Sequence, residues 1–263
     1  MRALLVSPLG FLIGLSLGAL GGGGSILAVP VLVYLAGQSS KQATATSLVL
    51  VAISAAVGMV PHWRAGRMRL GSGAVFGLAG VGGSLLGSHW NDAADPDALL
   101  LAFAGLMLIA AFAMFRRTRA VAAGPDEAAS TEPTVVRLDA ATVVKVLLAG
   151  TFVGLLTGFF GVGGGFVIVP ALVLALGFSM PEAIGTSLLV ISINAVVSLS
   201  TRLQGGNLEW SVIVPFAVSS VAGVLVGSRL AGTYNPKVLQ QWFVGLLVVV
   251  ALYTATRSAL ALW

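Results

Sequence analysis

The residues that could carry chemistry in this 263-residue chain are hydroxyls, one amide side chain and clustered glycines. The hydroxyl and amide candidates lie inside long apolar stretches and are Thr46, Ser47, Thr186, Ser187 and Asn194. The glycine candidates form two clusters, Gly22, Gly23 and Gly24 with Ser25, and Gly163 and Gly164 with Gly165. Consecutive glycines interrupt a helix and expose backbone N–H groups, since each Gly costs about 1 kcal/mol relative to Ala. Amides at a helix start favour negative charge, so these residues are a candidate binding site for a small anion.

The middle of each apolar segment contains no Asp, Glu, Lys or Arg, whereas proton- and ion-coupled carriers commonly place one there. A neutral lining suits an anion that must be released again, because a fixed positive charge would hold it tightly. His62 and His89 lie at segment ends beside Trp63 and Trp90, and we interpret both as interfacial residues. Proton coupling through His62, His89 or Glu182 is the alternative.

Enzymatic chemistry is not expected. A hydrolase built on Ser47 or Ser187 would need a histidine in the interior and an aspartate to complete a triad. The glycine clusters lack the Lys and Ser/Thr of a phosphate-binding loop, and no strand precedes them. The chain has no cysteine and no metal-ligand cluster in its sequence, so we expect no catalytic residue, no metal site and no cofactor.

The composition indicates a membrane protein with many crossings. Hydrophobic residues make up 57% of the chain and charged residues 9%, and the mean hydropathy is +1.02. The net charge of +5 comes from basic residues in short loops, which indicates topology rather than nucleic-acid binding. The expected partners are a small anionic substrate and membrane lipid, and the sequence does not indicate an oligomeric state.

The chain repeats itself. A shift that aligns Gly10 with Gly150 continues without a gap to Arg117 and Arg257, with roughly a third of the positions identical. Each half has four apolar segments, which predicts an all-α fold of two homologous repeats at residues 1–115 and 142–263. A polar, breaker-rich stretch at residues 116–141 is expected to be a solvent-exposed cytoplasmic linker. The GxxxG spacing at Gly10, Gly14 and Gly18, repeated at residues 150, 154 and 158, predicts close helix packing.

The first segment of each repeat is too long for one straight crossing. About 35 helical residues would measure roughly 52 Å, against about 30 Å for the hydrocarbon core. The glycine cluster therefore either breaks a tilted helix or turns a re-entrant pair of half-helices. The basic loops at residues 64–69 and 116–119 are expected in the cytoplasm and the acidic loop at residues 92–97 outside. This bias partly reverses in the second half, which favours inverted repeats; eight spans in parallel repeats are the alternative.

The paired motifs GALGGGGSILAVP at residues 18–30 and GFFGVGGGFVIVP at residues 158–170, followed by TATS and IGTS, resemble the sulfite exporter TauE/SafE family. The resemblance covers nearly the whole chain apart from the linker. It implies a multi-pass permease of the bacterial inner membrane, with several members linked to export of sulfite, organosulfonates or related anions.

Together these observations predict a permease that exports a small anion, sulfite or an organosulfonate, by alternating access around two glycine-rich helix breaks. An anion channel-like pore with the same lining is one alternative. A proton-coupled transporter of another small solute is the other.

Overall fold

The computed structural model describes residues 2–34, 37–38, 40–91, 96–123, 140–160, 165–202 and 210–261, which form helices and short turns with no strand among them. The helices are α1 (Arg2–Leu20), α2 (Gly23–Tyr34), α3 (Ser40–Arg64), α4 (Leu70–Asn91), α5 (Pro96–Ala123), α6 (Ala140–Phe160), α7 (Gly165–Leu174), α8 (Met180–Arg202), α9 (Trp210–Thr233) and α10 (Pro236–Ala261). In the described chain six of them, α3, α4, α6, α8, α9 and α10, are long and apolar enough to cross a membrane. The protein is an all-α, multi-pass membrane protein, as its composition predicts.

The outer surface of the helix bundle is apolar. Large hydrophobic side chains stand largely exposed on many helices, among them Leu78, Ile109, Phe152, Val218 and Val249. Water would disfavour so much apolar surface, whereas lipid tails accommodate it.

The first apolar segment of each half consists of two helices. α1 and α2 are separated by Gly21 and Gly22, while residues 161–164, between α6 and α7, lie outside the described part. α2 has 12 residues and α7 has 10, so they measure about 18 Å and 15 Å, roughly half the hydrocarbon core. A Cβ atom at Gly24 would overlap the carbonyl oxygen of Ile13 and lie 2.9 Å from the Cβ of Leu17. α2 therefore folds back along α1 instead of continuing it.

Corresponding elements of the two halves end in the same way. Gly37 and Gly177 both adopt a left-handed backbone, with φ of 70° and 74°. In each case the amide of the next residue hydrogen-bonds to the end of the preceding helix. The amide of Gln38 donates to the carbonyl of Leu32, and the amide of Phe178 donates to the carbonyl of Leu172, both at 3.1 Å. Glycine is required at these turns because other residues rarely adopt such φ values.

The corresponding helices α3 and α8 pack against each other in opposite directions. His62, near the end of α3, meets Gly185, near the start of α8, where a Cβ atom would lie 3.0 Å from that of His62. Earlier in α3, Gly58 faces Leu188, further along α8. Inverted repeats require this antiparallel relation, although the placement of the halves in a membrane stays a prediction.

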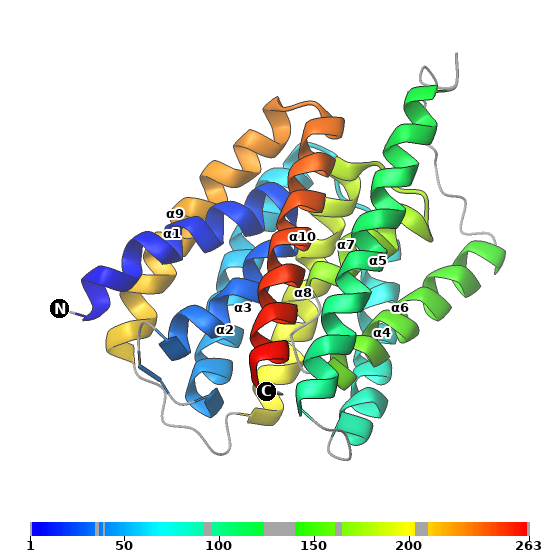
Figure 1. Cartoon of the computed structure of the whole chain (residues 1–263). Coiled ribbons are helices and arrows are strands. Elements are labelled where there is room, and N and C mark those ends of the chain that lie inside the picture. The colour runs from blue at the N-terminus through cyan, green and yellow to red at the C-terminus, as the bar shows by residue number, and fades with distance from the viewer. Residues whose placement is uncertain are drawn as a thin grey trace.

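The two halves interlock through glycines. α1 runs alongside α9, and α4 runs alongside α6 (Figure 1). A Cβ atom at Gly14 would overlap the carbonyl of Ser220, and one at Gly154 would overlap the carbonyl of Gly80. The GxxxG spacing thus provides close backbone packing between halves.

Three basic stretches, residues 64–69, 116–119 and 229–237, lie at one end of the molecule, as contacts of these segments or of residues next to them indicate. The guanidinium of Arg67 packs on Gly232 at the end of α9. Gln240, near the start of α10, donates to the carbonyl of Met114 near the end of α5. The positive-inside rule predicts that this end faces the cytoplasm.

The first part of the expected linker is helical. α5 continues past residue 115 to Ala123, and Arg117 donates to the carbonyl of Val173 on α7. The start of the expected linker is therefore helical and packed, because a long basic side chain can reach a buried carbonyl from a helix end. Residues 124–139 lie outside the described part.

Candidate functional site

The first glycine cluster ends α1 and turns the chain inside the protein. Gly21 has φ of 81°, a backbone conformation that residues with a side chain rarely adopt. The amide of Gly21 donates to the carbonyl of Leu17 at 2.8 Å, and that of Gly22 donates to Leu20 at 3.0 Å. Two carbonyls at the end of α1 are thereby paired within the protein, as the hydrocarbon environment requires.

The first break meets the start of α7. A Cβ atom at Gly22 would overlap the carbonyl group of Gly165 and lie 2.8 Å from the amide nitrogen of Phe166. A Cβ atom at Gly165 would in turn lie 2.6 Å from Oγ of Ser25. Gly22, Ser25 and Gly165, which the sequence analysis selected from both halves, are therefore in contact. α7 is central, with eight of its ten residues buried.

Ser187 reaches the same place from α8. A Cβ atom at Gly21 would overlap Oγ of Ser187 and lie 3.1 Å from Cα of Ile184. The Ser187 hydroxyl donates to the carbonyl of Ile184 at 2.8 Å, and the Ser25 hydroxyl donates to the carbonyl of Gly22 at 2.8 Å. Both hydroxyl protons are therefore directed at nearby carbonyls of the same segment.

Other predicted residues lie apart from this contact or outside the described part. Gly23 packs against Leu246 of α10, and Gly24 packs against α1. Asn194 faces Gly80 of α4, with its Oδ1 buried and without a hydrogen-bond partner in the described chain. Close packing alone accounts for Gly23 and Gly24 being glycine.

Thr46 and Ser47 are buried on α3. Gly163 and Gly164 lie outside the described residues. The role of all four residues in the predicted site stays a prediction.

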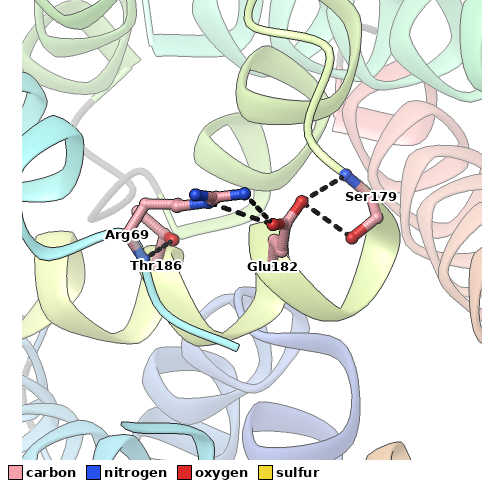
Figure 2. Close-up of polar contacts among 4 residues, drawn as sticks. All are labelled: Arg69, Ser179, Glu182 and Thr186. Atoms are coloured by element: carbon pink, nitrogen blue, oxygen red, sulfur yellow. Dashed lines mark hydrogen bonds and ion pairs between the residues drawn. The ribbon is translucent and has the colours of Figure 1, made fainter. Parts of the chain in front are cut away.

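Thr186 is held by the loop between α3 and α4 (Figure 2). Its Oγ1 accepts a hydrogen bond from the backbone amide of Arg69 at 3.1 Å. The Arg69 side chain pairs with Oε1 of Glu182, through Nη2 at 2.7 Å and Nε at 3.0 Å. Oε2 of Glu182 accepts from the amide of Ser179 at 3.1 Å and from its hydroxyl at 2.9 Å, which forms a cap on α8. The first half thus anchors the start of α8, which carries Thr186 and Ser187.

Comparison with protein-family models matches residues 6–254 to the family described as Sulfite exporter TauE/SafE. This chain belongs to that family. Because the match covers nearly the whole chain, the TauE/SafE fold includes both glycine clusters and the α3–α4 loop. The resemblance drawn from the paired motifs is confirmed.

Relatives of this TauE/SafE protein carry transporter names. A "Probable membrane transporter protein" of Xylella fastidiosa (strain 9a5c) is 34% identical over 252 residues, covering 95% of this chain and 93% of the relative. The "Probable membrane transporter protein YdhB" of Bacillus subtilis (strain 168) is 26% identical over 229 residues, covering 87% and 90%. No solved structure matches the chain.

The interfacial interpretation of His62 is wrong for this TauE/SafE protein. His62 is fully buried, and its Nε2 lies 3.4 Å from the carbonyl oxygen of Gly18. The neighbouring Trp63 is the exposed residue, with 57% of its surface accessible. His62, and not Trp63, therefore faces the glycine break, because the end of α1 packs against this turn of α3. The side chain of His89 lies outside the described part.

Gly21, which lies at the centre of the site, and Gly185, which packs against His62, were not among the predicted site residues. Gly21 has an identical counterpart in the repeat, Gly161, whereas the selected Gly22 pairs with Val162. That identity was the available signal for Gly21. Gly185 pairs with Ala45, so the alignment gave no comparable signal for it.

Proposed function

We propose that this chain is a permease of the bacterial inner membrane that exports a small oxyanion, sulfite or an organosulfonate. Transport proceeds by alternating access around the two glycine breaks. The observation that carries the proposal is the contact between Gly22 and Gly165, which brings the starts of α2 and α7 together. Two helix starts near one point attract negative charge without a fixed cation.

Backbone amides are the donors in this proposal. The first amides of a helix have no partner within it, and α2 and α7 both begin beside the contact. The hydroxyls of Ser25 and Ser187 donate to backbone carbonyls in this state. They therefore shape the site and supply oxygen atoms, while the anion is bound by the main chain.

The anion enters only when the breaks part. The backbones of Gly22 and Gly165 are in van der Waals contact, which leaves no room for an oxyanion between them. The described state is accordingly a closed one. Antiparallel packing of α3 and α8 supports a cycle in which the two halves exchange roles.

Export requires no coupling ion. One negative charge that leaves a cell at about 100 mV, negative inside, gains roughly 2.3 kcal/mol, equivalent to an approximately fifty-fold gradient. The basic end of the molecule, with the α3–α4 loop, is the cytoplasmic side in this proposal.

Flux in liposomes tests the proposal. Purified protein is reconstituted, and efflux of sulfite and of sulfoacetate is followed under a potassium-diffusion potential of either sign. We expect saturable efflux that rises when the lumen is negative, and no such flux in protein-free liposomes. Efflux that equals the protein-free value for both anions would overturn the proposed function.

A second candidate is proton-coupled transport, which the complete burial of His62 favours. A pH gradient of either sign, applied without a membrane potential, distinguishes the two. Flux that follows the pH gradient in the wild type and loses this dependence in His62→Gln supports coupling; flux that ignores the pH gradient supports uniport.

A further inference from the structure

The α3–α4 loop carries three arginines, and each lies in a different environment. Arg64 is exposed. Arg69 pairs with Glu182, so its charge is compensated (Figure 2). Arg67 differs from both, because its Nε is buried and has no hydrogen-bond partner in the described part of the chain.

Arg67 is held in place by its backbone and by close packing. Its amide donates to the carbonyl of His62 at 3.0 Å. Its own carbonyl oxygen would lie 2.5 Å from a Cβ atom at Gly185. Its two terminal nitrogens would each lie 3.1 Å from a Cβ atom at Gly232, on the last turn of α9. Glycine at both positions lets the loop lie directly on α8 and α9.

His62 presents a second unpaired nitrogen beside Arg67. Its Nδ1 is buried and has no partner among the described residues, and Gly185 packs against both His62 and Arg67. A neutral imidazole carries one ring N–H, and with Nε2 donating to the Gly18 carbonyl, Nδ1 of His62 is left as an acceptor. Buried nitrogens without a partner are rare in folded proteins, and these two, one in the last turn of α3 and one in the loop after it, indicate a bound ion or water.

We propose that Arg67 and His62 form a capture site for an oxyanion at the basic end of the molecule. The inference rests on the proposed function and adds the first step of transport to it. Arg67 supplies the charge and a planar set of donors that fits oxyanions, and Nδ1 of His62 supplies an acceptor for a proton carried by the anion or by a bound water.

The site lies next to the glycine breaks. Gly185 contacts both His62 and Arg67, and Ser187, two residues further along α8, contacts Gly21. The proposed capture site and the contact of the two breaks therefore both lie against the first turns of α8. The repeat places Asn207 at the position that matches Arg67 and Arg202 at the position that matches His62, so the second half does not repeat the pair of Arg67 and His62. Capture at one end suits export from that side.

Matched arginine variants test the site. Arg67→Gln and Arg64→Gln remove the same charge from the same loop, but only Arg67 is at the site. Thermal unfolding of the purified protein is measured in sodium sulfite and in sodium chloride of equal ionic strength, and the KM and maximal rate of sulfite efflux are measured in liposomes. We expect Arg67→Gln to raise KM about tenfold or more and to lose the sulfite-induced stabilisation, because a charge-assisted hydrogen bond is removed. We expect Arg64→Gln to keep the KM and the sulfite-induced stabilisation within about twofold of the wild-type values.

Arg67→Lys covers the case in which Arg67→Gln does not fold. It keeps the charge but removes Nε, and we expect a rise in KM smaller than that of Arg67→Gln. Equal KM values and equal sulfite-induced stabilisation in Arg67→Gln and Arg64→Gln would overturn the capture site. An unchanged KM with a lower maximal rate in either Arg67 variant would also overturn it.

Failure of the capture site differs from failure of the proposed function. If sulfite stabilises the wild type in a way that depends on Arg67, but the wild type shows no sulfite efflux, the proposed permease function is refuted and the capture site still stands. Normal efflux with an unchanged KM in the Arg67 variants would refute the site and leave the permease.

Discussion

Gly22→Ala tests the contact between the two halves most directly. Its Cβ would overlap the carbonyl group of Gly165 and lie 2.8 Å from the amide nitrogen of Phe166, both backbone groups that cannot rotate away. Ordinary contact begins at 3.4 Å, so the backbones must part by on the order of 1 Å. Gly22 is preferable to Gly21, because Gly21 has φ of 81° and Ala there would add backbone strain.

The energetic cost falls on the state in which the breaks touch. Overpacking of a close-packed site costs about 1–3 kcal/mol, which lowers the population of that state roughly 5- to 150-fold if other states are unaffected. We expect sulfite efflux from liposomes to fall about tenfold or more, since each transport cycle passes through the closed state.

Gly105→Ala on α5 is the matched control, because its Cβ would meet nothing within 4 Å. Ala is favoured over Gly in a helix by about 1 kcal/mol, so this variant should be at least as stable as the wild type and transport within twofold of it. Efflux of Gly22→Ala within twofold of Gly105→Ala, in equally folded protein, would refute the role of the contact.

Three further predictions concern the supporting contacts. Arg69→Ala and Glu182→Ala should each lower the free energy of unfolding by about 1 kcal/mol, because the ion pair is partly buried. The double variant should lose less free energy of unfolding than the sum of the two single losses. Additive losses, measured by thermal unfolding, would contradict this prediction. Thr186→Val should destabilise by about 1 kcal/mol, because the Arg69 amide loses its acceptor, whereas Thr157→Val, whose hydroxyl donates to its own helix, should change the unfolding temperature less. Gly154→Ala should lower the unfolding temperature and leave the KM of the folded protein unchanged, because α6 touches the backbone of α4 at this residue. An unchanged unfolding temperature would contradict this prediction.

Much of the fold could be predicted from local patterns. Hydropathy located the membrane helices, and the excess length of the first segment in each half predicted a division that α1 and α2 display at Gly21 and Gly22. The end of α5 could not be predicted in this way. Helix formation past residue 115 depends on packing and on Arg117 reaching α7, which hydropathy does not report.

The structure brings some of the predicted site residues together and leaves others apart, while their role in binding stays a prediction. Gly22, Ser25, Gly165 and Ser187 gather at one point. Asn194 does not, because its position on α8 directs it toward α4. His62 was misread because residues beside a tryptophan at a helix end resemble interfacial residues, and only the packing of α1 against that end buries it.

The sequence by itself determined the class of the protein, its family and the interruption of the first helix, because composition, motif and glycine content act locally along the chain. Tertiary structure decided which groups meet. The carbonyl of Gly165 lies against Gly22, and Arg69 pairs with Glu182 across the two halves. Nε of Arg67 is buried and has no hydrogen-bond partner among the residues that the structure describes. These contacts join residues far apart in sequence, so they follow from how the helices of both halves pack together and not from any single stretch of the chain.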